Sequence, residues 1–120
     1  NIVENEIISP NDELHIFYSD KLVDGKWNPH PKNPVISDVE KSRSAGKLFF
    51  HNGQLYRPSQ NCTKSYGYGL NINRIDLLNT KEYSETTIKK SYPNWSKKIK
   101  RFHTFNFENG LAVIDAFVDI

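Results

Sequence analysis

The sequence lacks several features that would place a protein in a class at once. Its single cysteine, Cys62, rules out an internal disulfide and a cysteine metal cluster. No apolar run approaches the roughly 18 residues of a membrane-spanning helix, and no signal-peptide pattern follows Asn1. The formal net charge is only +2, so strong attraction to a polyanion is not expected. We therefore expect no metal, no cofactor, no membrane span and no nucleic-acid partner. The compartment stays open, with the cytoplasm favoured.

The one basic run, KKIKR (97–101), does not change this expectation. A surface that binds duplex nucleic acid gathers many more phosphate contacts than five residues can make. We interpret the run as a solvated loop that leads into the next strand.

Two-residue alternation is the dominant pattern, and it predicts β-strands. It is present in ELHIFYSD (13–20), QLYRPS (54–59) and GYGLNIN (67–73). LAVIDAFV (111–118) is apolar on both faces, which predicts a strand buried on both sides. YSETTIKK (83–90) predicts a further strand, with Glu82 and Glu85 exposed on an outer face. No segment keeps an apolar 3.6-residue stripe for long, so we expect at most a turn or two of helix.

Turn signals separate these strands. HNGQ (51–54) and ENGL (108–111) contain Asn-Gly pairs, the strongest short hairpin signal, because both residues accept positive φ. VDGKW (23–27) offers Asp-Gly in the same role. The sequence therefore predicts an all-β fold of antiparallel hairpins.

The two Asn-Gly hairpins lie about one propeller-blade length apart, since blades repeat about every 40–50 residues. We expect residues 46–91 to form a complete four-stranded blade, residues 1–45 the end of one blade and residues 92–120 the start of the next. About two and a half blades cannot close a ring. This predicts a fragment of a larger propeller, or self-association through open strand edges. An ordinary β-sandwich or meander would use the same hairpins.

In an up-and-down blade, alternate loops lie at the same end, so polar residues distant in sequence should share one rim. Guanidinium, amide and phenol groups suit a polyhydroxylated ligand, and we expect a carbohydrate or sugar conjugate as partner. The predicted rim consists of Asp38, Arg43, Arg57, Gln60, Asn61, Tyr66 and His103. The alternative to ligand binding is a structural role for each residue. In that interpretation Arg57 pairs with a neighbouring carboxylate and Tyr66 is an ordinary packed aromatic.

Three residues have their own interpretations. For His103 there are three interpretations: a base, a hydrogen-bonding group of the pocket, or a core histidine. We favour the hydrogen-bonding role in the pocket. Cys62 is expected to be a small buried residue. Asp115 follows Ile114 in an apolar strand, where a carboxylate must be paired or hydrogen-bonded. We therefore expect a structural ion pair with a rim arginine.

Trp27 to Asp115 resembles the glycoside hydrolase family 43-like five-bladed propeller of the N-terminal region of glucosamine inositolphosphorylceramide transferases and related bacterial proteins. Arg43 falls on an SRPAG-like motif, although the chain has Ser44 where proline is usual. The resemblance implies a carbohydrate-active propeller domain, with this chain matching its C-terminal part.

Two further motifs carry this resemblance. Arg57, Gln60 and Asn61 fall on an RPxQD-like motif, with Asn61 in place of the aspartate, which removes an acid or base from that position. His103 matches an HT motif, and Asp115 matches an aspartate near the end.

Glycoside hydrolysis generally needs two carboxyl groups, about 5–5.5 Å apart for retention or 6.5–9.5 Å for inversion. Asp38 is the rim acid we assign as catalytic, with Arg43 or Arg57 holding it ionised. A lone carboxylate cannot play both roles, so the chain by itself is expected to be inactive. The sequence thus predicts part of a domain that binds or processes a glycan. A non-catalytic sugar-recognition module and a purely structural β-module are the alternatives.

Overall fold

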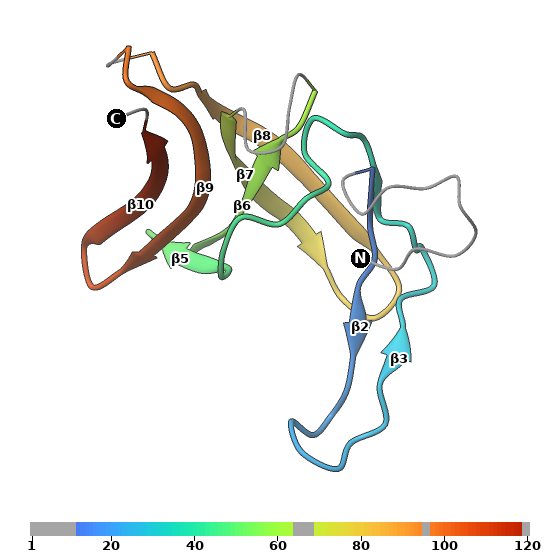
Figure 1. The fold of residues 1–120 in the computed structure, drawn as a ribbon. Coiled ribbons are helices and arrows are strands. Elements are labelled where there is room, and N and C mark those ends of the chain that lie inside the picture. The colour runs from blue at the N-terminus through green and yellow to red at the C-terminus, as the bar shows by residue number, and fades with distance from the viewer. Residues whose placement is uncertain (1–11, 64–68, 95–96, 119–120) are drawn as a thin grey trace.

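The computed structural model describes residues 12–63, 69–94 and 97–118 and, for Phe102 and His103, the backbone only. These residues form ten strands and no helix (Figure 1). All pairings between the strands are antiparallel. The prediction of an all-β fold of antiparallel hairpins is confirmed.

The largest sheet has four strands in the order of the sequence: β5 (Phe49–His51), β6 (Gln54–Asn61), β7 (Gly69–Leu78) and β8 (Tyr83–Ser91). The β5–β6 turn has Asn52 at φ 51° and Gly53 at φ 76°, the positive values that a tight hairpin requires. Two register shifts interrupt the β7–β8 ladder, one after Ile72 and one after Ile75. Such bulges increase the local twist of a sheet.

A second hairpin, β9 (Ile99–Glu108) and β10 (Leu111–Val118), turns at Asn109 and Gly110, with φ values of 52° and 76°. It lies beside β5 in Figure 1. The chain approaches β9 closely at Gly46, where a Cβ would lie 2.1 Å from the Phe105 carbonyl oxygen. The neighbouring Ala45 carbonyl accepts a 2.8 Å hydrogen bond from the Phe105 N–H. Glycine at residue 46 therefore allows β9 to contact the four-stranded sheet.

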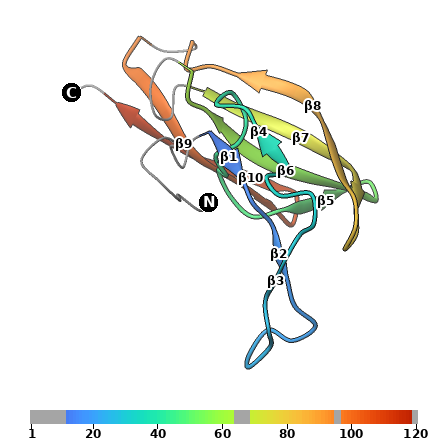
Figure 2. The same ribbon diagram turned by 90° about the vertical axis from the view of Figure 1, so that its right-hand side faces the viewer.

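The N-terminal part forms two short ribbons. β1 (Glu13–Leu14) pairs with β4 (Ile36–Ser37), and β2 (Phe17–Tyr18) pairs with β3 (Asn28–Pro29). The β2–β3 ribbon extends away from the main sheet (Figure 2). The prediction of a single strand over ELHIFYSD (13–20) is therefore wrong. The Asn33 side chain bonds both the N–H and the C=O of Ile16, and so takes the place of a strand partner at the break.

Apolar packing is concentrated between the four-stranded sheet and β9. Ala45 and Leu70 are buried there, with Ile99 and Phe105 packed against them. The Phe49 ring is 5.4 Å from Tyr56, 5.7 Å from Phe105 and 5.4 Å from Phe107 between centroids, distances typical of stabilising aromatic pairs. Cys62 is buried and free, as expected.

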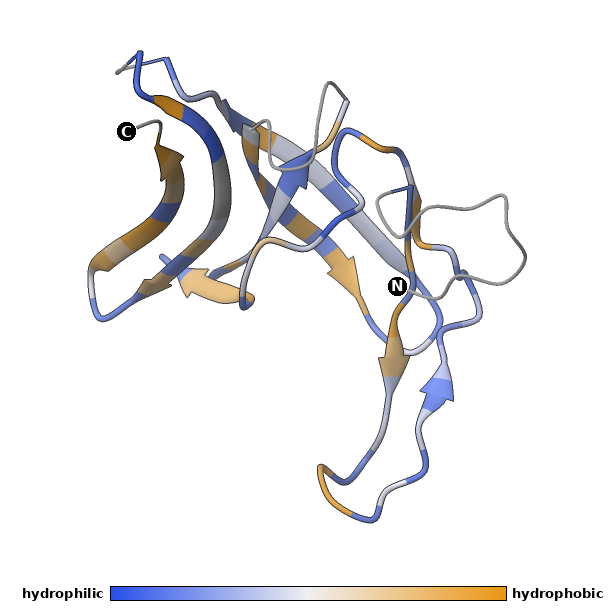
Figure 3. Cartoon of the chain, in the orientation of Figure 1, coloured by the Kyte–Doolittle hydropathy of each residue, from blue (hydrophilic) through white to orange (hydrophobic). Residues whose placement is uncertain are grey.

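Two predictions about the C-terminal hairpin are wrong. Every residue of β10 is exposed, including Val113 and Phe117 at 55% and 53%. In the described part of the chain β10 pairs with β9 alone, and the exposure of all its residues shows that its two apolar faces are not covered there. Figure 3 shows hydrophobic stretches in β10 and β5. Most of the KKIKR run also differs from the loop we expected, because Ile99 to Arg101 belong to β9.

Candidate functional site: a polar pocket on the β6–β8 sheet

One face of the β6–β8 sheet is buried although it is polar. Arg57 lies opposite Asn73 on β7, and Asn73 lies opposite Thr87 on β8. Asn73 is fully buried. Its Nδ2 donates to the Arg57 carbonyl and to Ser59 Oγ, both at 2.9 Å, and its Oδ1 accepts from Thr87 Oγ1 at 2.7 Å. These bonds make the burial of an amide tolerable.

Arg57 forms a bidentate ion pair with Glu85 in this polar face. Its Nε and Nη2 donate to the two Glu85 carboxylate oxygens at 2.8 and 2.7 Å, and the two side chains are only 5% and 0% exposed. Burial alone would lower the pKa of Arg57, but the hydrogen bond and charge of Glu85 outweigh it and raise that pKa. The Tyr83 hydroxyl donates to Glu85 at 2.7 Å. Burial, followed by the charge of Glu85, raises the pKa of Tyr83.

The position of Glu85 contradicts our expectation that it is exposed. Within β8, Tyr83, Glu85 and Thr87 are partly buried while Ser84 and Thr86 are exposed. The alternation therefore places Glu85 on the inner face, where only a cation can compensate its charge. The ion pair also agrees with the alternative in which Arg57 pairs with a neighbouring carboxylate.

The segment from Asp38 to Arg43 crosses this polar face, and sheet side chains hold its backbone. Arg57 Nη2 donates to the Lys41 carbonyl at 2.7 Å, and Asn71 Nδ2 donates to the Glu40 carbonyl at 2.6 Å. The Cys62 N–H donates to the Val39 carbonyl at 3.2 Å. The loop is thus fixed from β6 and β7, although it precedes both in sequence.

Internal bonds also shape the loop. The Ser42 N–H donates to the Asp38 carbonyl at 2.8 Å, and Ser42 Oγ accepts from the Asp38 N–H at 3.0 Å. The Glu40 N–H donates to Asp38 Oδ1 at 2.8 Å. Such side-chain bonds to nearby backbone are typical of aspartate in turns, and here they orient the Asp38 carboxylate.

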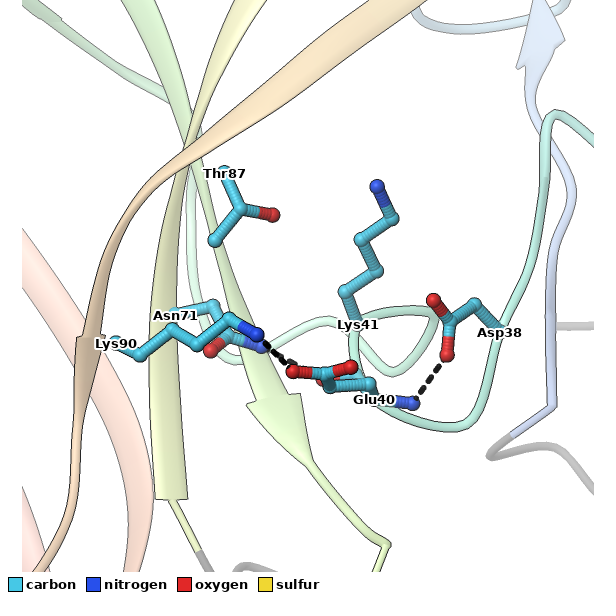
Figure 4. A pocket seen from close by; sticks show the side chains of 6 residues that line it. All are labelled: Asp38, Glu40, Lys41, Asn71, Thr87 and Lys90. Atoms are coloured by element: carbon cyan, nitrogen blue, oxygen red, sulfur yellow. Dashed lines mark hydrogen bonds and ion pairs between the residues drawn. The ribbon is translucent and has the colours of Figure 1, made fainter.

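A pocket of about 110 Å³ lies between this loop and the sheet (Figure 4). Lys90 on β8 and Glu40 on the loop form an ion pair across it. This hydrogen bond to Glu40 raises the pKa of Lys90. The lining residues are Asp38, Glu40, Lys41, Asn71, Thr87 and Lys90. We refer to this site as the loop pocket.

Asn71 contributes a buried acceptor to the loop pocket. The residue is 1% exposed. Its Nδ2 is used by the Glu40 carbonyl, and its Oδ1 has no hydrogen-bond partner among the described residues. An unsatisfied buried acceptor is costly, and an ordered water or a ligand hydroxyl is the kind of donor that would satisfy it.

The structure brings together some of the predicted rim residues. Asp38 lines the loop pocket, and Arg57 fixes its loop. The Gln60 N–H donates to the Arg43 carbonyl at 2.8 Å, which places the end of β6 beside the loop. Gln60 and Asn61 are buried at 3% exposure each. Asn61 Oδ1 accepts from the N–H and hydroxyl of Thr63 at 3.0 and 2.7 Å, so it serves a local turn.

The remaining predicted residues lie elsewhere or outside the description. Tyr66 lies outside the described residues. His103 belongs to β9 by its backbone, and its side chain is not described. Asp115 Oδ1 accepts from the N–H and hydroxyl of Thr104 at 2.6 and 2.9 Å. These bonds meet the expectation that its carboxylate is hydrogen-bonded, although Asp115 is exposed.

Sequence reasoning missed five of the six residues that line the loop pocket. A usable signal was present in GLNIN, where Asn71 and Asn73 repeat at a two-residue spacing within a strand. Asparagine is depleted in strands, so two on one face indicate a polar layer. The lysines and Glu40 carried no such signal, because charged residues usually face solvent.

A second hollow, of about 240 Å³, lies beside β5 and the β9–β10 turn and shares no lining residue with the loop pocket. Its lining includes Phe49 and Phe50 of β5 and Phe107 of β9, with Lys47 and Glu108 beside them. The two charged side chains are 3.7 Å apart and exposed. This ion pair supplies a matched control for the charged residues of the loop pocket.

The described residues include no group of three or more His, Cys, Asp or Glu residues that could hold a metal ion. Within the same part of the chain, no helix has the length and hydropathy needed to cross a membrane.

Comparison with known proteins identifies related sequences. The family described as glucosamine inositolphosphorylceramide transferase 1, N-terminal, matches residues 3–109. A glucosamine inositolphosphorylceramide transferase 1 of Arabidopsis thaliana is 35% identical over 80 residues, which cover 65% of this chain and 10% of that protein. The one of Oryza sativa subsp. japonica is 36% identical over 83 residues, which cover 68% and 11%.

The chain thus spans about a tenth of the length of these curated relatives. No solved structure matches it. The family match covers most of the chain and includes the loop pocket. The chain belongs to the family of the N-terminal region of glucosamine inositolphosphorylceramide transferase 1.

Proposed function

We propose that this chain is part of a domain that binds or processes a glycan or sugar conjugate, and that the loop pocket contacts the sugar. The observation that carries the proposal is Asn71, a buried amide that lines the pocket with its Oδ1 unpaired among the described residues. The family supports it, since each matched relative carries the name glucosamine inositolphosphorylceramide transferase 1.

The lining of the loop pocket suits a hydroxylated ring. A sugar hydroxyl both donates and accepts, and the pocket offers acceptors at Asp38 and Asn71 and a donor at Lys41. The loop that carries Asp38 and Lys41 is fixed by the buried Arg57. A site whose groups are already held in place loses little conformational freedom on binding.

Recognition is the better supported of the two roles. The pocket does bring a second carboxylate, Glu40, beside Asp38, which sequence reasoning did not find. Glu40 is committed to Lys90, however, and Asp38 accepts the Glu40 N–H. A glycosidase needs one carboxyl group free to give a proton to the leaving group. We therefore propose a sugar-recognition site, with Asp38 as its acidic residue, and keep catalysis by Asp38 as the alternative.

We also propose that the family domain is a glycoside hydrolase family 43-like five-bladed propeller, with residues 46–91 as one complete blade. The supporting observations are the sequential β5–β8 meander and the β9–β10 hairpin that follows it. In this arrangement residues 1–45 end the preceding blade and residues 92–120 begin the next.

The function is tested by glycan-array binding of the full-length protein. We expect binding of at least one sugar or glycolipid class, and a loss of about tenfold or more in the double variant Asp38→Ala/Lys41→Ala, because two direct contacts are removed. The matched control is Lys47→Ala/Glu108→Ala, which removes one acid and one base outside the loop pocket.

The control variant should bind as the unmodified protein does. The proposal fails if the folded protein binds no glycan on the array, or if both double variants bind as well as the unmodified protein.

A further inference from the structure

We propose that the loop pocket takes the edge of one uncharged, hydroxyl-rich ring, such as a neutral hexose or a cyclitol, and discriminates against rings that carry a charge at that edge. The inference rests on the proposed function and names the part of a glycan that the same site contacts.

The first reason is the balance of charge. The pocket is lined by two carboxylates and two ammonium groups, those of Asp38, Glu40, Lys41 and Lys90. Their formal charges cancel. A ligand charge of either sign therefore meets a like charge at close range, and no excess of the opposite sign compensates for its loss of water.

The ion pair strengthens this reason. Glu40 and Lys90 are bound to each other across the pocket, so neither is available to a charged ligand unless the pair is broken. Asp38 and Lys41 remain as the acceptor and the donor for a neutral ring.

The second reason is the character of the pocket floor. Asn71 uses its Nδ2 for the Glu40 carbonyl, which fixes the amide orientation and leaves Oδ1 as an acceptor without a partner among the described residues. Thr87 gives its one hydroxyl hydrogen to Asn73 Oδ1, so toward the pocket it can only accept. Two acceptors require a donor, which a hydroxyl supplies and an ionised carboxylate does not, so the pocket floor argues against an anionic group at that edge.

The third reason is size. The pocket volume is about 110 Å³, several times the roughly 10–15 Å³ that one water molecule needs by the same measure. This is room for several polar groups, as the hydroxyl-bearing edge of one ring supplies.

The test is a set of calorimetric or saturation-transfer titrations of the full-length protein. The probes are myo-inositol, D-glucose, D-glucosamine and D-glucuronate. We expect at least one of the two neutral rings to bind about fivefold or more tightly than either charged sugar, since one unbalanced charge at contact distance in water is worth about that factor.

Two variants change the charge of the pocket without removing its structure. Asp38→Asn keeps the oxygen that accepts the Glu40 N–H, and should improve D-glucuronate binding relative to the neutral rings. Lys41→Gln keeps the carbonyl that Arg57 holds, and should improve D-glucosamine binding in the same way. Lys47→Gln, outside the pocket, should leave all four affinities unchanged.

The outcomes separate the two proposals. Tighter binding of a charged sugar, lost in the pocket variants, would overturn the neutral-ring inference but leave the glycan function intact. The inference would also be overturned if a neutral ring is preferred but this preference is the same in both variants. In that case the charge of the pocket would not be the cause of the preference. If no sugar binds here and none binds on the array, both proposals fail together.

Discussion

Arg57 links the interior of the sheet to the loop pocket at the scale of a single residue. Its guanidinium is nearly buried, holds both oxygens of Glu85 and also donates to the Lys41 carbonyl. The planar fork of arginine fits a carboxylate in this way, whereas the single ammonium of lysine does not. Arg57 is therefore a positioning residue for the loop.

This arrangement predicts that removing Arg57 alone costs more stability than removing Arg57 and Glu85 together. Arg57→Met should lower the free energy of unfolding by about 3–5 kcal/mol, because it leaves the charge of Glu85 buried without its partner. The double variant Arg57→Met/Glu85→Leu should cost less than the single variant, since no buried charge remains. Urea unfolding followed by circular dichroism measures both.

The exposed pair of Arg74 and Asp76 is the control, with N–O separation of 2.6 Å and side chains 43% and 34% exposed. Its Arg74→Met variant should cost no more than about 1 kcal/mol. An equal cost for Arg57→Met and Arg74→Met would contradict the role of burial.

At the scale of the element, β5 depends on two glycines for different reasons. Gly53 has φ 76°, and a Cβ at this residue would have no neighbour within 4 Å, so the glycine serves the hairpin turn only. Gly46 precedes β5, and a Cβ there would meet the Phe105 carbonyl oxygen of β9 at 2.1 Å. The first glycine fixes the shape of a turn, and the second allows two sheets to approach.

These glycines should respond differently to alanine. Gly53→Ala should cost about 1–2 kcal/mol, the penalty for a Cβ in a left-handed conformation. Gly46→Ala should cost more, because backbone atoms of β9 must move away. Differential scanning calorimetry of both variants tests the order, and a larger loss for Gly53→Ala would contradict the close approach.

At the scale of the whole molecule, β10 is apolar but exposed. Packing within the described part of the chain does not account for its apolar sequence. Leu111, Val113 and Phe117 are all more than half exposed. Strands in a propeller are covered on both faces by neighbouring blades, and an apolar sequence on both faces suits that position. The proposed five-bladed propeller accounts for the sequence of β10.

A charge placed in β10 tests this proposal. In the full-length protein, Val113→Lys should lower the free energy of unfolding by about 3 kcal/mol or more, because blade packing would bury an unpaired ammonium. Thr80→Lys, in the exposed β7–β8 turn, should stay within about 0.5 kcal/mol. Equal small effects in chemical unfolding would count against a propeller that covers β10.

Local patterns in the sequence were sufficient for some of the strands and turns but not for the strand partners. The alternation in GLNIN and the Asn-Gly pairs located β7 and both hairpin turns, because these patterns depend on neighbouring residues only. ELHIFYSD was divided in two by Asn33, which lies seventeen residues beyond Ile16 in sequence. No property of the segment itself reveals a side chain that replaces its strand partner.

The candidate site shows the same division. Asp38 and Arg57 were identified from sequence as neighbours of a polar rim, and the structure places Asp38 in the pocket and Arg57 beneath the loop. Glu85 was misplaced because a glutamate in a polar strand is usually exposed. Its burial depends on Arg57, which lies 28 residues away.

By itself, the sequence determined the β class, the hairpin turns and the family, because strand periodicity, positive-φ turns and motif identity are local properties. Tertiary structure decided which polar residues are buried, which carboxylate pairs with Arg57, and that the loop of Asp38 and Lys41 meets Asn71 and Thr87 in one pocket. The physical reason is that burial and charge pairing are set by residues distant in the chain, whose approach depends on how the strands are ordered and twisted in space.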